Sequence, residues 1–478
     1  MRFISINFAP MGVFKDKSDA LLGLIREGKP LSGGEKLNLI VQLSIPSILA
    51  QITSVVMFFI DQAMVGHLGE KASAACGIVE TTMWLFGSLT GAASMGFSVQ
   101  VAHFIGANDF VKARQVFRHA LIVTTLLSFG MMIGAVAIAK PLPFWLGGGA
   151  DIAHDASLYF LIFSLSCPFF QLNSLSSAML KCSGNMRIPS MVSVIMCVLD
   201  VVFNYLFIYQ AHLGVMGAAI GTALSIVICG VAQSYIAIFR NKMLSLRRVG
   251  ERFVWVTSYL VNALKIGLPM AAQSVLMSGA QIVGTMIVAP LGNLSIAANT
   301  LAITAESLCY MPGFGIGEAA TTLIGQSMGA GRHDLCRSFA RMTLYSGMAV
   351  MAFMGVVMYI FAPEMMALMT PVDEIVNLGA RCLRIEAFAE PMFAASIIAV
   401  SVCVGAGDTL KPAVISLCSM WLVRLTLAYM FSIHYGLVGV WVAMAIELSF
   451  RGLLLTIRLF RGKWMNKMIV QQNTPESL

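Results

Sequence analysis

Long apolar runs separated by short polar connections dominate this sequence. A helix needs roughly 20 predominantly apolar residues to cross the hydrocarbon core of a bilayer, and each run reaches about that length. The pattern therefore predicts an all-α integral membrane protein with twelve transmembrane helices. These helices are expected at residues 39–65, 72–105, 116–140, 154–180, 189–210, 214–239, 259–290, 295–328, 338–362, 373–405, 412–433 and 436–460.

The composition agrees with a membrane protein and argues against several other classes. The chain has 478 residues, of which 58% are hydrophobic and 11% are charged, whereas a soluble protein is about 25% charged. The ten cysteines show no regular spacing, which argues against a disulfide framework or a zinc site. No GxxxxGK[ST] loop is present, so ATP is not an evident energy source. We therefore expect no bound cofactor.

The basic residues are placed asymmetrically. The odd-numbered connections contain only Lys71 and Lys140, whereas the even-numbered connections and both chain ends are rich in Lys and Arg. By the positive-inside rule, both termini are expected to be cytoplasmic. The net charge of +8 thus marks the inner membrane face and not a nucleic-acid surface. The basic connections contain Lys112, Arg114, Arg118, Lys181, Arg187, Arg240, Lys242, Arg247, Arg248, Arg252, Arg332, Arg337, Arg341 and Lys411.

The two halves of the chain are related by a constant shift of 223 residues, for example from Pro46 to Pro269. Each half holds six helices, so both halves enter the membrane from the same side and the repeats are parallel. The predicted division is a cytoplasmic segment (1–38), an N-lobe (39–239), a cytoplasmic linker (240–258), a C-lobe (259–460) and a cytoplasmic tail (461–478). Further pairs are Leu68-Gly69 with Leu291-Gly292, Gly106-Ala107 with Gly329-Ala330, Arg114 with Arg337, Arg118 with Arg341, and Gly184 with Gly407.

Asp61 is the only charged residue between Lys36 and His67, within the first predicted helix. A charged Asp at the centre of such a helix costs about 3 kcal/mol on insertion scales, and less towards the helix ends. An acid in this position is a functional candidate that faces protein or water. The alternative is a structural Asp that is capped or paired near the outer end of the helix.

Asp200 and Asn204 stand four residues apart on the fifth predicted helix, and so share one face. Counting the helical rise from the outer ends puts Asp61, Asn204 and Asp200 about 8, 9 and 15 Å deep, so the three side chains are expected to meet in the N-lobe. Two neighbouring carboxyl groups away from water are not readily ionised at the same time, so at least one of them holds a proton closer to neutral pH. A proton carrier requires such a group. The same oxygens, with the Asn204 carbonyl, could instead bind Na⁺, and a purely structural hydrogen-bonded pair is the third possibility. Glu80 is a lesser candidate near the outer rim.

The second half carries more charge in its predicted helices. Glu306, Glu386, Glu390 and Arg424 all fall in the outer half of the membrane. Buried charges persist when they are paired, so one interpretation is an ionic network that locks helices 8, 10 and 11 together. The other is a direct role in binding substrate or cation, because an unpaired acid would attract a cationic compound. The repeat places Arg424 next to the counterpart of Asp200.

Several motifs resemble the multidrug and toxic compound extrusion (MATE) family over nearly the whole chain. They are the acid before MVGHLG, the turns GANDFVKAR and GAGRHDLCR, the paired turns SGN and AGDT, and LDVVFNYLFIY followed by LGVMGAAIGTALS. The resemblance implies a secondary exporter of cationic or amphiphilic compounds that is driven by inward H⁺ or Na⁺ and whose two lobes alternate. It also implies a bacterial-type inner membrane protein that acts as a monomer and meets small-molecule drugs or metabolites and membrane lipids.

This chain departs from the family pattern at two places. Many relatives carry Asn and then Asp on the fifth helix, whereas here the order is Asp200 and then Asn204. Several relatives place a Glu on the seventh helix, where this chain has Gln273, Met277 and Gln281. A cation site in the N-lobe is therefore favoured, and the two glutamines are candidates for substrate contact.

The first interpretation is an inner-membrane multidrug antiporter coupled to H⁺ through Asp61 and Asp200. Coupling to Na⁺, or a lipid-linked glycan flippase of the wider superfamily, is the alternative. A flippase should have a strongly basic central cavity for pyrophosphate, whereas the intramembrane charges here are mixed. A membrane-embedded enzyme is disfavoured because no HExxH, GxSxG or clustered His is present. A channel is disfavoured because two repeated lobes suit alternating access.

Overall fold

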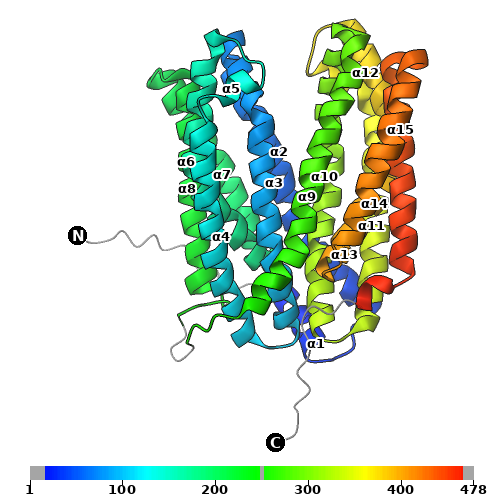
Figure 1. Ribbon diagram of the computed structural model, residues 1–478. Helices are drawn as coiled ribbons and strands as arrows, with labels where there is room; N and C mark the ends of the chain where they lie inside the picture. Colours follow the sequence, from blue (N-terminus) through cyan, green and yellow to red (C-terminus); the bar gives the residue numbers. More distant parts are fainter. Residues whose placement is uncertain (1–16, 248–251, 467–478) are drawn as a thin grey trace, which may run out of the picture.

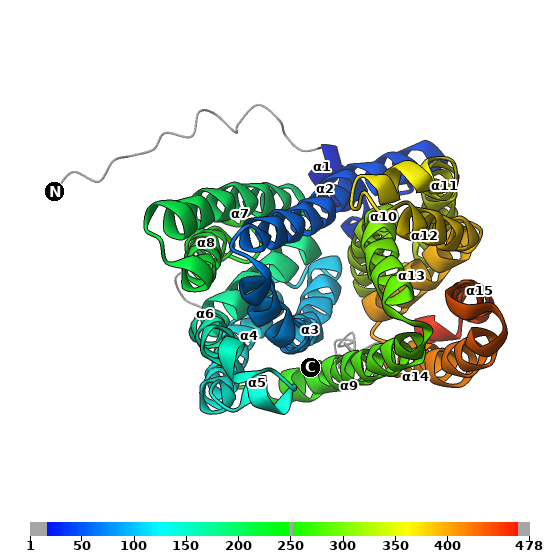
Figure 2. The same cartoon turned by 90° about the horizontal axis from the view of Figure 1, so that it is seen from above.

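The computed structural model describes residues 17–247 and 252–466. The predicted N-terminal segment, linker and tail therefore lie partly outside the described residues, in 1–16, 248–251 and 467–478. The described chain folds into long helices that stand side by side in two groups (Figure 1). Seen along the helix axes, the groups sit next to each other, with α2 to α8 in one and α9 to α15 in the other (Figure 2). We call these groups the N-lobe and the C-lobe.

The first half of the chain forms a short helix followed by six spans. Helix α2 begins with a capping box, in which Ser32 accepts from the Glu35 amide and Glu35 accepts from the Ser32 amide. The elements are α1 (Lys17–Arg26), α2 (Gly33–Gly66), α3 (Glu70–Gly106), α4 (Phe110–Ile138), the short α5 (Leu142–Trp145), α6 (Ala150–Cys182), α7 (Arg187–Tyr205) continued by η1 (Leu206–Gln210), and α8 (Gly214–Tyr235) continued by η2 (Ile236–Arg240).

The second half repeats this order. The bent pair α12 and α13 forms one span with an angle of 58° between its parts. Residues 410–460 form two spans, because Gly436 takes φ +57° and breaks the long helix α15 there. The elements are α9 (Thr257–Val288), η3 (Ala289–Leu291), α10 (Asn293–Gly329), α11 (His333–Ala367), α12 (Asp373–Glu386), α13 (Glu390–Gly405), α14 (Leu410–Cys418), η4 (Ser419–Arg424), α15 (Leu425–Phe460) and η5 (Lys463–Asn466).

The described residues thus make twelve spans, and the predicted fold class is confirmed. Eight stretches are long and apolar enough to cross a membrane on their own, and the bent pair makes a ninth. Residues 410–460 supply a further span, and α3 and α10 supply the last two. Helices α3 and α10 are less apolar because they pack against the opposite lobe, α3 on α9 and α10 on α2. Less of their surface therefore faces lipid.

The shift of 223 residues is visible in the helix boundaries. It carries α3 (Glu70–Gly106) onto α10 (Asn293–Gly329), and the whole of α6 onto the span from Asp373 to Gly405. Turn glycines follow the same rule, because Gly184 and Gly407 both take positive φ, at +93° and +81°. A side chain is strained in that conformation, which explains why both turns keep a glycine.

The basic connections of both lobes lie at one end of the bundle, drawn at the bottom of Figure 1. We call it the basic end. Helix α1 also lies there, beneath the two lobes. Its Leu22 and Ile25 are fully buried in the core formed with α10. The apolar face of α1 therefore packs on the protein itself.

The two lobes contact each other near the basic end through a symmetric pair of hydrogen bonds. His103 of α3 donates from Nε2 to the Gly405 carbonyl oxygen at 2.8 Å. Its counterpart in the repeat, Gln326 of α10, donates from Nε2 to the Cys182 carbonyl oxygen at 2.9 Å. Beside them, a Cβ at Gly106 would overlap the backbone of the opposite lobe. The close packing of α3 and α10 therefore requires a glycine there.

Candidate functional site

The N-lobe brings together the three polar residues that the sequence predicts to meet. Asn204 Nδ2 donates to Asp61 Oδ1 at 2.9 Å and to Asp200 Oδ2 at 3.2 Å. The two carboxyl groups, from α2 and α7, are also within hydrogen-bonding reach of each other. Asp200 and Asn204 are fully buried, and Asp61 is half-buried. We call this group the N-lobe acid site.

Helix α8 completes the N-lobe acid site with residues that the sequence analysis missed. Ser225 Oγ lies 3.3 Å from Asp200 Oδ1 and donates to it. Gly221, one turn before Ser225, leaves room for the Asn204 amide, because a Cβ at Gly221 would overlap Asn204 Oδ1. Small residues such as these carry no pattern that distinguishes them from ordinary helix-packing positions. Their role becomes visible once α7 and α8 are packed together.

The orientation of the Asn204 amide decides what the N-lobe acid site offers. Its NH₂ group faces both carboxyl groups, whereas its oxygen faces Gly221 and accepts no hydrogen bond among the described residues. The two acids therefore share one amide donor, and Ser225 donates to only one of them, Asp200. A proton between the two carboxyl groups would give Asp61 a second donor, so this arrangement suits a site that holds a proton.

Glu80 of α3 lies apart from this site and has its own partners. Gln62 Nε2 donates to Glu80 Oε2 at 3.3 Å, and Trp84 Nε1 donates to Glu80 Oε1 at 3.1 Å. Glu80 is half-buried, and Trp84 is exposed. These contacts fit a local structural role near the end of the helix.

The C-lobe buries three glutamates that the sequence analysis singled out. Glu306 of α10, Glu386 of α12 and Glu390 of α13 are each at most 3% exposed. Glu386 and Glu390 flank the 58° bend between α12 and α13, and the charges of Glu306 and Glu390 lie close enough to affect each other. The carboxyl oxygens of Glu386 and Glu390 accept no hydrogen bond within the described chain. We call these three residues the C-lobe acid cluster.

Arg424 lies within electrostatic reach of Glu306 and Glu386, but its hydrogen bond is to the Met444 sulfur. It stands at the end of a short π-helical turn, η4, a feature that is frequent at functional sites. The residues described here therefore do not form the closed ionic network that is one of the two sequence interpretations. Buried acids without donors are costly unless a proton or a cation joins them.

Two other charged residues of the C-lobe, both on α15, do form an ion pair. Arg451 Nε lies 3.3 Å from Glu447 Oε1, as the spacing of four residues predicts, and Ser419 Oγ donates to the same oxygen at 2.7 Å.

The two predicted glutamines of α9 differ in exposure, since Gln273 is half-buried and Gln281 is exposed. Within the described residues we find no hydrogen bond from either glutamine side chain to the C-lobe acid cluster.

A group that sequence reasoning missed joins the two lobes. Glu318 of α10 pairs with Lys181 at the end of α6, with 2.7 Å between Oε1 and Nζ. Gln51 Nε2 donates to the same oxygen at 3.1 Å, and Ser47 donates to the other carboxyl oxygen. Glu318 stands in a run of small residues within a predicted helix, a signal that could have drawn attention. We call these four residues the cross-lobe cluster.

Two six-helix lobes in parallel repeat, with acids buried inside each lobe, define the architecture of a secondary transporter. The sequence profile of the MatE family matches residues 46–206 and 269–430, once in each repeat. The chain therefore belongs to the MatE family of multidrug efflux transporters.

Individual relatives are distant but cover nearly the full length. The chain is 24% identical over 447 residues to the "Probable multidrug resistance protein NorM" of Thermotoga maritima, covering 92% of this chain and 95% of that protein. The solved structure described as "Crystal structure of MATE in complex with MaL6" has a TM-score of 0.87 at 21% identity, covering 94% of this chain and 99% of that one. Another, "Outward-facing conformation of a multidrug resistance MATE family transporter of the MOP superfamily", has a TM-score of 0.85 at 21% identity, with 91% and 97% covered.

Proposed function

We propose that this protein is a secondary active exporter that exchanges cationic or amphiphilic compounds for inward-moving H⁺. The proton is held at the N-lobe acid site by Asp61 and Asp200, with Asn204 between them. The two lobes, residues 39–239 and 259–460, rock about their contact at the basic end. The observation that carries the proposal is the Asn204 amide donor shared by two carboxyl groups at a mostly buried site.

The amide orientation favours H⁺ over Na⁺. Sodium is a hard cation and needs oxygen ligands, and the Asn204 amide would have to turn its oxygen towards the carboxyl groups. That oxygen instead faces Gly221, and the NH₂ group donates to both carboxyl groups. Coupling to Na⁺ by the same fold is therefore the second candidate. A glycan flippase is less well supported, because the buried charges of the C-lobe acid cluster are acidic.

Helix α2 links the N-lobe acid site to the lobe interface. It carries Asp61 and, ten residues earlier, Gln51, so about 15 Å of rigid helix separates the acid site from the cross-lobe cluster. A change in the hydrogen bond between Asp61 and Asn204 would shift α2 relative to α7. That shift would act on the contact of α2 with Glu318. Proton binding can thereby influence whether the basic end stays closed.

The cross-lobe cluster suits a lock that holds the lobes together at the basic end. Opening that end must separate Lys181 from Glu318 and break the hydrogen bonds from Ser47 and Gln51. Both members of the ion pair are partly exposed, at 20% and 29%, so the pair is weak enough to break in each cycle.

The C-lobe acid cluster is the proposed attraction site for the positive charge of the substrate. The carboxyl oxygens of Glu386 and Glu390 have unmet hydrogen-bonding capacity that a cationic drug or metabolite can fill, and the charge of Glu306 lies close enough to add to theirs. Gln273 lies on the neighbouring α9 and is half-buried, so it can add a polar contact. Gln281 and Arg424 are proposed to affect the affinity of the same site for substrate.

The proposed orientation places the basic end in the cytoplasm of a bacterial-type cell, with both termini inside and the chain in the inner membrane as a monomer. The substrates are proposed to be small drugs or metabolites that reach the protein through the lipid or from the cytoplasm.

Dye efflux from proteoliposomes tests this function. The purified protein is reconstituted, and efflux of a cationic dye is followed under a pH gradient without Na⁺, then under a Na⁺ gradient without a pH gradient. We expect export in the first condition and none in the second. Asp61→Asn should behave like empty liposomes, and Glu80→Gln, a matched acid outside the site, should behave like the unmodified protein. Export driven by Na⁺ alone would support the second candidate instead.

A further inference from the structure

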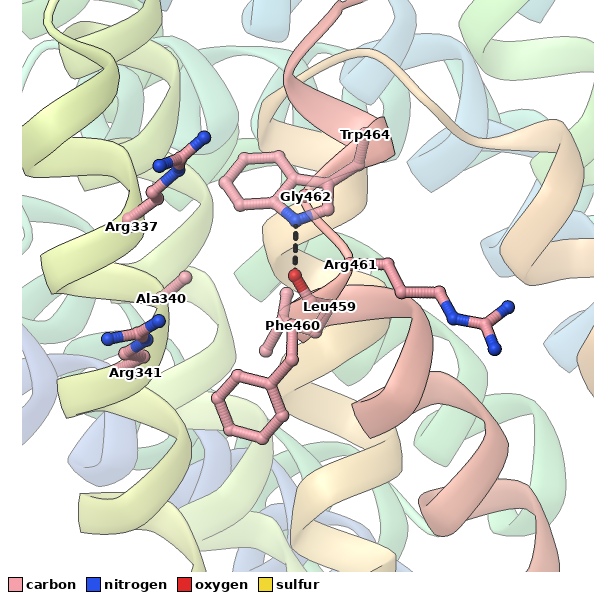
Figure 3. A pocket seen from close by; sticks show the side chains of 8 residues that line it. All are labelled: Arg337, Ala340, Arg341, Leu459, Phe460, Arg461, Gly462 and Trp464. Atoms are coloured by element: carbon pink, nitrogen blue, oxygen red, sulfur yellow. Dashed lines mark hydrogen bonds between the residues drawn. The ribbon is translucent and has the colours of Figure 1, made fainter.

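A cavity of about 200 Å³ opens at the basic end of the C-lobe, between α11 and the end of α15. Arg337 and Arg341 project towards it from successive turns of α11, and Phe460 and Trp464 face them from the other side (Figure 3). The Trp464 indole donates to the Leu459 carbonyl oxygen at 2.9 Å, which fixes the ring as the floor of the cavity. The cavity is thus built by ordered groups.

The two arginines of this cavity are exposed and have no carboxylate partner within the described chain. Asp334, one turn before Arg337, is already paired with Arg332 at 3.2 Å. The Arg341 guanidinium lies 5.9 Å from the centre of the Phe460 ring, a cation–π contact that orients it but leaves its N–H donors unused. Two adjacent guanidinium groups with free donors match the oxygens of a phosphate.

The repeat provides an internal comparison. The counterparts of Arg337 and Arg341 in the N-lobe are Arg114 and Arg118. Arg114 is buried and donates to the Met243 carbonyl oxygen at 3.1 Å, and Leu244 fills the adjoining space. The chain itself therefore supplies the acceptor in the N-lobe. In the C-lobe the equivalent space is open, and the acceptor must come from outside.

We propose that this cavity binds the phosphodiester headgroup of an anionic phospholipid. The cavity volume is several times the ~30 Å³ that a water molecule occupies in the liquid, so it can hold a phosphate with part of its alcohol. Phe460 and Tyr345 beside it are 44% and 59% exposed, and their tilted rings have centres 6.4 Å apart. Such an apolar flank suits an acyl chain better than a free ion. Basic pockets at the cytoplasmic face of a membrane are known to suit anionic lipids. The proposal therefore rests on the orientation proposed above, which places the basic end in the cytoplasm.

The test is thermal unfolding of the full-length protein in detergent, with phosphatidylglycerol, phosphatidylcholine or inorganic phosphate added. Native mass spectrometry of the same samples counts the lipids retained. The variant is Arg337→Gln with Arg341→Gln. The control is Arg240→Gln with Lys242→Gln, which removes two exposed basic residues at the basic end of the N-lobe, outside the cavity.

We expect phosphatidylglycerol to raise the Tm of the unmodified protein and of the control, and phosphatidylcholine to have little effect. The cavity variant should lose that rise. Its affinity for phosphatidylglycerol should fall by about tenfold, since two charge-assisted contacts are removed. An equal rise in the cavity variant and the control would overturn the proposal, because it would mean general charge attraction. Equal protection by inorganic phosphate would overturn the assignment to a lipid. If the double variant cannot be purified, Arg341→Gln alone must show reduced lipid retention.

Discussion

The two lobes share an ancestry in sequence and shape but bury their acids in different ways. In the N-lobe acid site, two carboxyl groups share the Asn204 amide, and one of them also accepts from Ser225. In the C-lobe acid cluster, Glu386 and Glu390 have no hydrogen-bond donor in the described chain. A satisfied pair can be switched by adding or removing one proton. An unsatisfied cluster instead attracts a positively charged group.

This contrast suggests a division of labour in which the N-lobe exchanges the small ion and the C-lobe receives the substrate. The repeat itself favours such a division, because one lobe can keep the acids for ion exchange while the residues of the other lobe change. The shift of 223 residues carries Asp200 onto Val423, beside Arg424. The acid of one lobe is therefore replaced by an apolar residue next to a base in the other.

The largest expected effect comes from removing the acid of α2. Asp61→Asn leaves a neutral side chain of the same size next to Asn204, so the fold and insertion should be retained. The site then has one carboxyl group and cannot exchange a proton between two. Gradient-driven dye efflux should fall to the level of liposomes without protein. Efflux at the normal rate would remove Asp61 from the mechanism.

Gly221→Ala should disturb the N-lobe acid site without changing any polar group. The added Cβ would overlap Asn204 Oδ1 and force the amide away from the carboxyl groups. We expect a loss of stability of about 1–3 kcal/mol, as for other overpacked positions, together with strongly reduced proton coupling. Gly134→Ala is the matched control, because that glycine, on α4, has open space around it. Identical behaviour of the two variants would contradict the described packing.

The C-lobe half of the comparison is tested by Glu390→Gln and Glu306→Gln. Each removes one acid from the cluster, so the apparent affinity for a cationic dye should fall by about five- to tenfold, which corresponds to ~1.0–1.4 kcal/mol. Transport of an uncharged amphiphile should change little, and the dependence on the pH gradient should remain. The readouts are KM values for both substrates in proteoliposomes. A loss of H⁺ coupling with unchanged KM would reverse the proposed roles of the lobes.

A smaller effect is expected at the cross-lobe cluster. Glu318→Gln removes the ion pair with Lys181 and leaves one amide oxygen, which can still accept from either Ser47 or Gln51. A partly exposed pair contributes about 0.2–1 kcal/mol, so the population with an open basic end should rise by up to about fivefold. Distances between spin labels on the two lobes at the basic end report that population. Unchanged distance distributions would mean that the cluster does not lock the lobes.

Much of the fold could be predicted from the sequence. Apolar length alone located the spans, and the repeat fixed their parallel arrangement. The meeting of Asp61 with Asn204 could also be anticipated, because helical rise converts residue number into membrane depth. The depth of a residue along a helix is a local property, and that is why it can be read from a single sequence.

The parts that could not be predicted depend on how helices pack. Glu318 and Lys181 are 137 residues apart, and only the contact between α10 and the end of α6 makes them a pair. The donor face of the Asn204 amide, the space left by Gly221 and the burial of Leu22 in α1 likewise follow from neighbouring helices. Sequence pattern shows that a residue is apolar or charged, but the partner that it meets is decided by tertiary structure.

The central claim is that the acids of the N-lobe exchange a proton for the substrate. It is tested most directly by adding a cationic dye to the purified protein in weakly buffered detergent solution and recording the pH. We expect release of protons on dye binding by the unmodified protein, and none by Asp61→Asn, although that variant should still bind the dye. Dye binding by the unmodified protein without any change in pH would contradict the account.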